Sequence, residues 1–140
     1  MTRRSVHIAL HWTVFMLILA MVKGGTSAQW VRWLFVGCVA VWVSIALIKG
    51  LIGKAGPKLG PTTKAVYPWM HRAIYLVLAV SAGLNAAELL GLIAAGPAWT
   101  SLLVLLGIGA FHGLFQFWRH TALYDNALHL ITPKFMHKVV

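Results

Sequence analysis

Acidic residues are almost absent from this chain. Glu88 and Asp125 are the only two, against 12 lysines and arginines, and charged residues make up 10% of the 140 positions. The apolar spans described below place these carboxylates on opposite sides of a membrane, so they cannot together form an acid–base pair or a metal site. Cys38 is the only cysteine, which excludes an internal disulfide and a paired-cysteine metal motif. Most soluble-enzyme chemistry is therefore hard to build from this sequence.

Long apolar runs dominate what is present. Hydrophobic residues make up 60% of the chain, too large a share for an ordinary soluble domain. Four runs have the length of roughly 20 residues that a helix needs to cross a bilayer. They are residues 6–22, 31–52, 69–93 and 99–118. The sequence predicts an all-α fold, a single integral-membrane four-helix bundle over residues 1–140 with a surface tail at 119–140, and the lipid bilayer is its first expected partner.

The net charge of +10 is explained by membrane topology. If the four spans alternate in direction, only Lys23 and Arg32 fall on one side and ten basic residues fall on the other. Those ten are Arg3, Arg4, Lys49, Lys54, Lys58, Lys64, Arg72, Arg119, Lys134 and Lys138. Basic residues accumulate in cytoplasmic loops, so both termini and the middle loop are predicted to be cytoplasmic. No basic helix or RNA-binding module is left over, and nucleic acid is not an expected partner.

Proline and glycine mark the breaks between spans. Residues 53–61 contain two Gly-Pro pairs and are predicted to be a non-helical loop. Pro68 is predicted to open the third span. Apolar residues at helical spacing predict a short amphipathic surface helix over residues 121–131, ending before Pro133. Near the outer end of the third span, Glu88 is expected to contact the lipid boundary or a partner.

Two histidines lie inside separate apolar spans at matched depth. His11 is about 8 Å inside the first span and His112 about 9 Å inside the fourth, from the helical rise per residue. An ionisable side chain in lipid is costly and is by default a functional-site hypothesis. Imidazoles at one depth on facing helices are typical of axial ligation of a haem inside a bundle. The alternative is two buried histidines bonded to the backbone or to each other.

Small residues stand beside His112. Gly109 lies one turn before it and Gly113 directly after it. Small residues let a flat ring approach a helix backbone. Glycine is common in membrane helices in any case, but this placement favours a cofactor.

Further candidate residues fall on the cytoplasmic side, where the propionates of a haem would emerge. They are His7, His71, Arg72 and His120. Arg72 could pair with a propionate, and His71 is also the best spare axial ligand. For each residue the alternative is ordinary interfacial snorkelling. His129 and His137 are expected to be solvated residues of the tail.

Three segments carry motifs in a recognisable order. Residues 3–12 end in a histidine-tryptophan pair, residues 71–75 read His-Arg-Ala-Ile-Tyr, and residues 112–126 run from one histidine through another to an Asp-Asn pair. In these features the chain resembles the bacterial cytochrome b561 family. The wider relatives of that family include the four-helix cytochrome b subunits of formate dehydrogenase and hydrogenase. The matching segments touch three of the four predicted spans.

Members of that family usually hold two b-type haems, one above the other. The resemblance implies that His11 and His112 ligate the cytoplasmic-side haem. The outer haem of the family takes one histidine from the second span and another fourteen residues before the fourth-span ligand. Here the second span has neither histidine nor methionine, and the other position is Ala98. The resemblance therefore implies a variant with one haem b.

A single haem near one face cannot carry electrons across the bilayer alone. In the related dehydrogenase subunits a quinone binds near the cytoplasmic-side haem, which implies a quinone near His112, His120 or the middle loop. We therefore expect a b-type cytochrome of the bacterial inner membrane that relays electrons between quinone and a redox partner, as an electron-transfer subunit or a quinone-linked oxidoreductase. The alternative is a degenerate cytochrome acting as an accessory or structural subunit of a larger membrane complex. A small transporter is disfavoured because no inverted repeat or broken helix is apparent.

Overall fold

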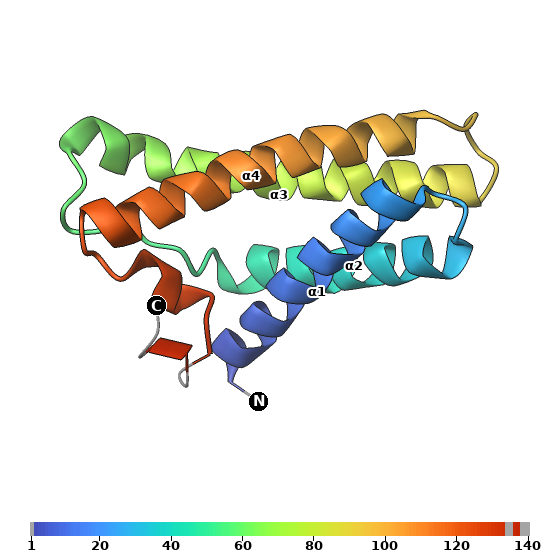
Figure 1. The fold of residues 1–140 in the computed structure, drawn as a ribbon. Helices are drawn as coiled ribbons and strands as arrows, with labels where there is room; N and C mark the ends of the chain where they lie inside the picture. The colour runs from blue at the N-terminus through green and yellow to red at the C-terminus, as the bar shows by residue number, and fades with distance from the viewer. Residues whose placement is uncertain (1, 134–135, 138–140) are drawn as a thin grey trace.

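The computed structural model describes residues 2–133 and 136–137, and within them it is an antiparallel bundle of four helices (Figure 1). The long helices are α1 (Arg3–Gly24), α2 (Gln29–Lys49), α3 (Pro61–Leu89) and α4 (Pro97–Ala122), and a short 3₁₀ helix, η1, covers Ala127–Leu130. Each long helix packs on the next, and α1 also contacts α4, which closes the bundle. The predicted all-α four-helix fold is confirmed.

All four long helices are long and apolar enough to cross a membrane. Most of their apolar side chains face outward: Leu47 is 81% exposed, Ile48 79% and Leu76 66%. A surface of this kind is unfavourable in water and favourable in hydrocarbon. The outward faces therefore fit a lipid bilayer, as the sequence predicts.

Basic residues gather at one end of the bundle, which we call the basic end. It comprises the start of α1, the loop from residue 50 to 60, the start of α3 and the end of α4 (Figure 1). Lys23 and Arg32 belong to the opposite end, near the α1–α2 connection. Lys134 and Lys138, which also entered the charge argument, lie outside the described residues.

The core follows an inward stripe with a spacing of three and four residues on the helices. Its buried members are Val14, Ile18, Met21, Phe35, Val39, Trp42, Leu78, Ala82, Leu102 and Leu105. Such a stripe is typical of helices that pack on neighbours with one face only. Trp42 lies beside His7 and His11, and the other members of the cluster lie further from the basic end.

The helix boundaries differ from the predicted spans by several residues, most of all around the third span. The second helix ends at Lys49 and not at residue 52, because Gly50 turns into the positive-φ region at 73°. The third begins eight residues before residue 69, at Pro61, where a missing N–H costs nothing. Pro68 therefore lies inside α3 and does not open it. The same helix ends at Leu89, before Gly91 at a φ of 69°.

The predicted surface helix over residues 121–131 is wrong. Helix α4 ends at Ala122, and within residues 123–133 the helical structure is the four-residue η1. Tyr124 and Asn126 interrupt the path because both adopt positive φ, at 51° and 56°, a conformation outside any right-handed helix. The residues from 123 to 133, here called the C-terminal segment, instead fold back toward the start of α1 (Figure 1).

Candidate functional site

Four histidines continue the inward stripe toward the basic end. His7 and His11 lie on α1, His71 on α3 and His112 on α4. The rings of His71 and His112 meet edge to face with centroids 5.1 Å apart, and those of His7 and His11 are 6.5 Å apart. The helices that carry His11 and His112, α1 and α4, contact each other. We call these four residues the histidine cluster.

Two members of the cluster have a buried nitrogen without a hydrogen-bond partner. These atoms are Nδ1 of His11 and Nδ1 of His112. Leaving a buried polar atom unpaired costs about 1–3 kcal/mol, so native proteins rarely keep one without a ligand, a water or a function. At these two Nδ1 atoms the structure shows neither a bond to the backbone nor a bond between the two histidines.

The inward stripe of α4 contains a glycine next to His112. The buried residues Leu102, Leu105, Gln116 and Arg119 define the stripe, and Gly109 falls between them at the same spacing. A Cβ placed on Gly109 would meet no atom within 4 Å. Gly109 is exposed and lies on the stripe one turn before the unpartnered imidazole, where the missing side chain would let a flat ring approach the helix backbone.

Gly109 faces the side of α4 that turns toward α1. Phe115 marks the opposite flank, since its ring contacts Tyr67 of α3 at 6.4 Å. With a turn of about 100° per residue, Gly109 and Gly113 lie on the flank away from α3. Gly113 also borders open space and is exposed, as Gly109 is, but it lies at the edge of the stripe.

The donor set fits a porphyrin-bound iron better than a bare metal ion. No group of three or more histidine, cysteine, aspartate or glutamate side chains that could hold a metal occurs in residues 2–133 and 136–137. A bare ion such as zinc takes three or four protein ligands. Haem iron needs only one or two, because the porphyrin supplies the other four. Two imidazoles on separate helices that contact each other fit that need.

His71 is held in place by the structure around it. Its Nδ1 lies 3.1 Å from the carbonyl oxygen of Tyr67, one turn earlier in α3. A Cβ on Gly53 would lie 3.0 Å from its Nε2, so the loop of the basic end packs directly against this nitrogen. His71 therefore supports the site from the side of the loop, and its second nitrogen faces Gly53.

Arg72 is not brought to the histidine cluster. Its guanidinium lies 4.8 Å from the centroid of the Trp69 ring, and the side chain is exposed. A cation over an indole at a membrane boundary is a common interfacial arrangement. The snorkelling interpretation fits this residue better than pairing with a propionate.

The histidines near the chain's end form their own group. The ring of His120 lies 5.6 Å from that of His129, which stacks on His137 at 4.1 Å and 4°. Arg4 reaches them from α1 and donates to the carbonyl oxygen of His129 at 2.6 Å. His129 and His137 are both half-buried and were expected to be solvated residues of the tail; their contacts with each other and with Arg4 remove part of their surface from solvent. His120 has a buried Nδ1 without a partner.

A buried polar network beside the site was not expected from the sequence. Arg119 is bonded to Asp125 and, at 2.9 Å, to the amide oxygen of Gln116, whose amide nitrogen approaches the Tyr67 hydroxyl at 3.4 Å. Gly56 of the loop lies against the Arg119–Asp125 pair, where a Cβ would collide with both side chains. The signal available in the sequence was spacing, since Gln116 and Arg119 continue the inward stripe of α4.

The opposite half of the bundle is closed by packing and by an ion pair. Arg32 and Glu88 are 2.8 Å apart, and Arg32 Nε donates to the side-chain oxygen of Asn85 at 2.9 Å. Glu88 also accepts the backbone N–H groups of Gly96 and Ala98 at the start of α4. Its side chain is 5% exposed, so it is an internal contact and not the lipid-boundary or partner contact that was expected.

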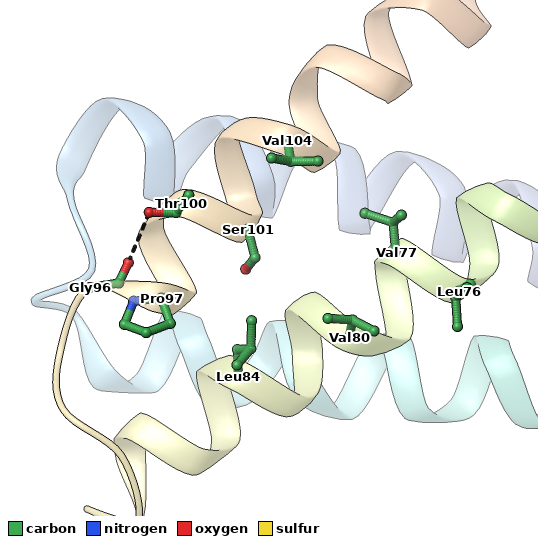
Figure 2. A pocket seen from close by; sticks show the side chains of 9 residues that line it. All are labelled: Leu76, Val77, Val80, Leu84, Gly96, Pro97, Thr100, Ser101 and Val104. Atoms are coloured by element: carbon green, nitrogen blue, oxygen red, sulfur yellow. Dashed lines mark hydrogen bonds between the residues drawn. The ribbon is translucent and has the colours of Figure 1, made fainter.

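A groove between α3 and α4 lies away from the histidines. It has a volume of about 710 Å³ and is lined largely by aliphatic side chains, among them Leu76, Val80 and Leu84 of α3 and Val104 of α4 (Figure 2). The hydroxyl of Thr100 in its wall is turned to the carbonyl oxygen of Gly96. The groove offers no imidazole, thiol or carboxylate, so it does not coincide with the candidate site.

Comparison of the chain with protein-family models, with curated proteins and with solved structures gave no match.

Proposed function

We propose that this protein is a membrane b-type cytochrome that binds one haem between α1 and α4 through His11 and His112. The observation that carries the proposal is the pair of buried, unpartnered imidazole nitrogens on these two helices. The open space at Gly109, one turn from His112, supports it. Bound iron would supply a one-electron redox centre, and the protein would set its ligands, its burial and its access to partners.

The proposal includes a single cofactor near the basic end. In the opposite half, Ala98 is fully buried and Leu102 and Phe35 are closed to solvent. In that half, the charged side chains of Arg32 and Glu88 are bonded to each other. That packing supports one haem, in agreement with the absence of further histidines from the described helices of that half. The proposal places the basic end at the cytoplasmic face of a bacterial inner membrane.

Electron exchange with a membrane quinone completes the proposed role. The site lies within the bundle near one end, at a depth that a quinone headgroup in the adjacent leaflet can reach. His120 and the loop that covers His71 border the same end. We expect reduction of the cytochrome by a quinol and delivery of the electron to a separate redox partner.

The test begins with the purified full-length protein in detergent. A reduced-minus-oxidised spectrum should show a low-spin b-type signal, and a pyridine haemochrome assay should give about one haem per chain. His11→Ala and His112→Ala should each abolish the low-spin signal, whereas His129→Ala should retain it. A colourless preparation with full helical content would refute the cytochrome.

A second measurement separates electron transfer from an accessory role. Stopped-flow mixing with a short-chain quinol should reduce the bound haem on a catalytic timescale. If haem is bound but quinol does not reduce it, and the protein co-purifies with a large membrane complex, the accessory-subunit alternative replaces the electron-transfer role.

A further inference from the structure

Trp42 of α2 makes a specific hydrogen bond to the histidine cluster. Its indole Nε1 lies 3.0 Å from Nδ1 of His7, and the two rings meet nearly edge to face at 5.3 Å and 70°. The Trp42 side chain is buried, and its ring also contacts His11 and Tyr75. These packing contacts hold the indole in place in addition to its hydrogen bond to His7.

The direction of this hydrogen bond is determined by chemistry. An indole N–H is only a donor, so Nδ1 of His7 must accept. A neutral imidazole that accepts at Nδ1 carries its proton on Nε2. A nitrogen that holds a proton has no lone pair to give to a metal. His7 thus differs from His11, one turn further along α1, whose Nδ1 has no partner.

The surroundings of His7 favour an anionic acceptor. Its Nε2 has no hydrogen-bond partner among the residues that the structure describes. Helix α1 opens with Arg3 and Arg4 and has no acidic residue in its first turn, so the local charge is positive. His7 precedes His11 by four residues, so it lies about 6 Å closer to the basic end along the helix axis.

We infer that Trp42 fixes His7 as a hydrogen-bond donor, and that His7 Nε2–H binds a carboxylate of the porphyrin held by His11. This inference rests on the proposed function for the identity of the acceptor. The donor state of His7 rests on the Trp42 contact alone. Trp42 is a positioning residue. The donor state of His7 and the binding of His7 to the carboxylate can be tested separately.

The first experiment needs no bound cofactor. The full-length protein is labelled with ¹⁵N-histidine, prepared without haem, and its imidazole tautomers are read from long-range ¹H–¹⁵N correlations, with His7 assigned by loss of its signals in His7→Gln. His7 should be protonated on Nε2, and Trp42→Phe should convert it to a mixture of tautomers. Trp33→Phe, on the same helix but 44% exposed, is the control and should change nothing. A proton on Nδ1 in the parent protein, or no response to Trp42→Phe, would overturn the inference.

The second experiment uses haemin as the probe. His7→Leu should keep the low-spin spectrum but release haem to apomyoglobin roughly tenfold faster, the loss expected for a hydrogen bond to a charged group. The midpoint potential should fall, because an uncompensated carboxylate favours ferric iron. His7→Gln, which retains a side-chain N–H donor, should restore both values.

The outcomes distinguish the inference from the function on which it rests. Loss of the low-spin spectrum in His7→Leu would make His7 a ligand and overturn the inference. If His7→Leu leaves the haem release rate and the midpoint potential unchanged, His7 does not bind the carboxylate. If the parent protein binds no haemin, the proposed function fails, while the tautomer experiment still decides whether Trp42 fixes His7.

Discussion

Arg119 and Asp125 form an ion pair that is closed to solvent, with Nη2 and Oδ2 2.7 Å apart and the side chains only 2% and 0% exposed. A second bond joins Arg119 Nε to the same carboxylate oxygen at 2.9 Å. The pair ties the end of α4 to the C-terminal segment, and Gly56 of the loop packs against it. It therefore joins three separate parts of the basic end.

Replacing the carboxylate should be strongly destabilising. Asp125→Asn leaves the Arg119 guanidinium buried without a counter-charge, which costs about 3–5 kcal/mol when a buried pair is broken on one side. We expect a large drop in the free energy of unfolding, measured by reversible denaturation in mixed micelles. The double variant Arg119→Met/Asp125→Asn removes both charges and should recover much of the loss. Equal stability of the single variant and the parent would show that water reaches the pair.

Filling the space at Gly109 should block the cofactor without unfolding the bundle. In Gly109→Leu the new side chain points into the open space beside His112. The haem content per chain should fall to a small fraction of the parent value, while circular dichroism shows unchanged helicity. Gly107→Leu is the matched control, because Gly107 has equally open surroundings but lies about 160° around the helix from Gly109, away from the inward stripe. Full haem content in Gly109→Leu would exclude this side of α4 as the site.

His71 should support the site without ligating iron. Its Nδ1 is near the Tyr67 carbonyl oxygen and its Nε2 faces Gly53. We expect His71→Ala to retain one haem per chain and a low-spin spectrum. The electron paramagnetic resonance g values should shift, because the His71 ring contacts the edge of His112. A change to a high-spin spectrum would instead identify His71 as an axial ligand.

The number and type of helices could be predicted from apolar run length alone, because lipid leaves a helix as the only way for a single span to satisfy its backbone. The start of α3 could not be predicted from the sequence in this way. Pro68 is typical of a helix start, yet α3 begins at Pro61. Pro68 lies in the second turn of α3, at the basic end, where water and neighbouring groups can satisfy the carbonyl that loses its partner.

The histidines were identified by depth, but their partners depend on tertiary packing. Trp42 is 35 residues from His7 in sequence, and no local pattern links them. Glu88 was misplaced for the same reason: its partners Arg32 and Ala98 come from two other helices. The tail was mispredicted because apolar spacing indicates a helix, whereas Tyr124 and Asn126 adopt positive φ in the folded chain.

The attachment of the C-terminal segment to α1 gives a last prediction. Trp12 Nε1 donates to the carbonyl oxygen of Ile131 at 2.9 Å, and Arg4 donates to those of His129 and Thr132. Because the segment has little helix of its own, its order depends on these few bonds. Trp12→Phe removes one bond worth about 1 kcal/mol.

Amide hydrogen exchange in residues 123–133, followed by mass spectrometry, should therefore become roughly fivefold faster in Trp12→Phe. Exchange in the middle of α2 should stay unchanged, which separates local opening from global unfolding. Trp33→Phe is the control, since Trp33 lies near the start of α2 at the opposite end of the bundle. If exchange in the segment is the same in both variants, the Trp12 bond is not needed, and the bonds from Arg4 of α1 and from Arg119 of α4 are enough to hold the segment in place.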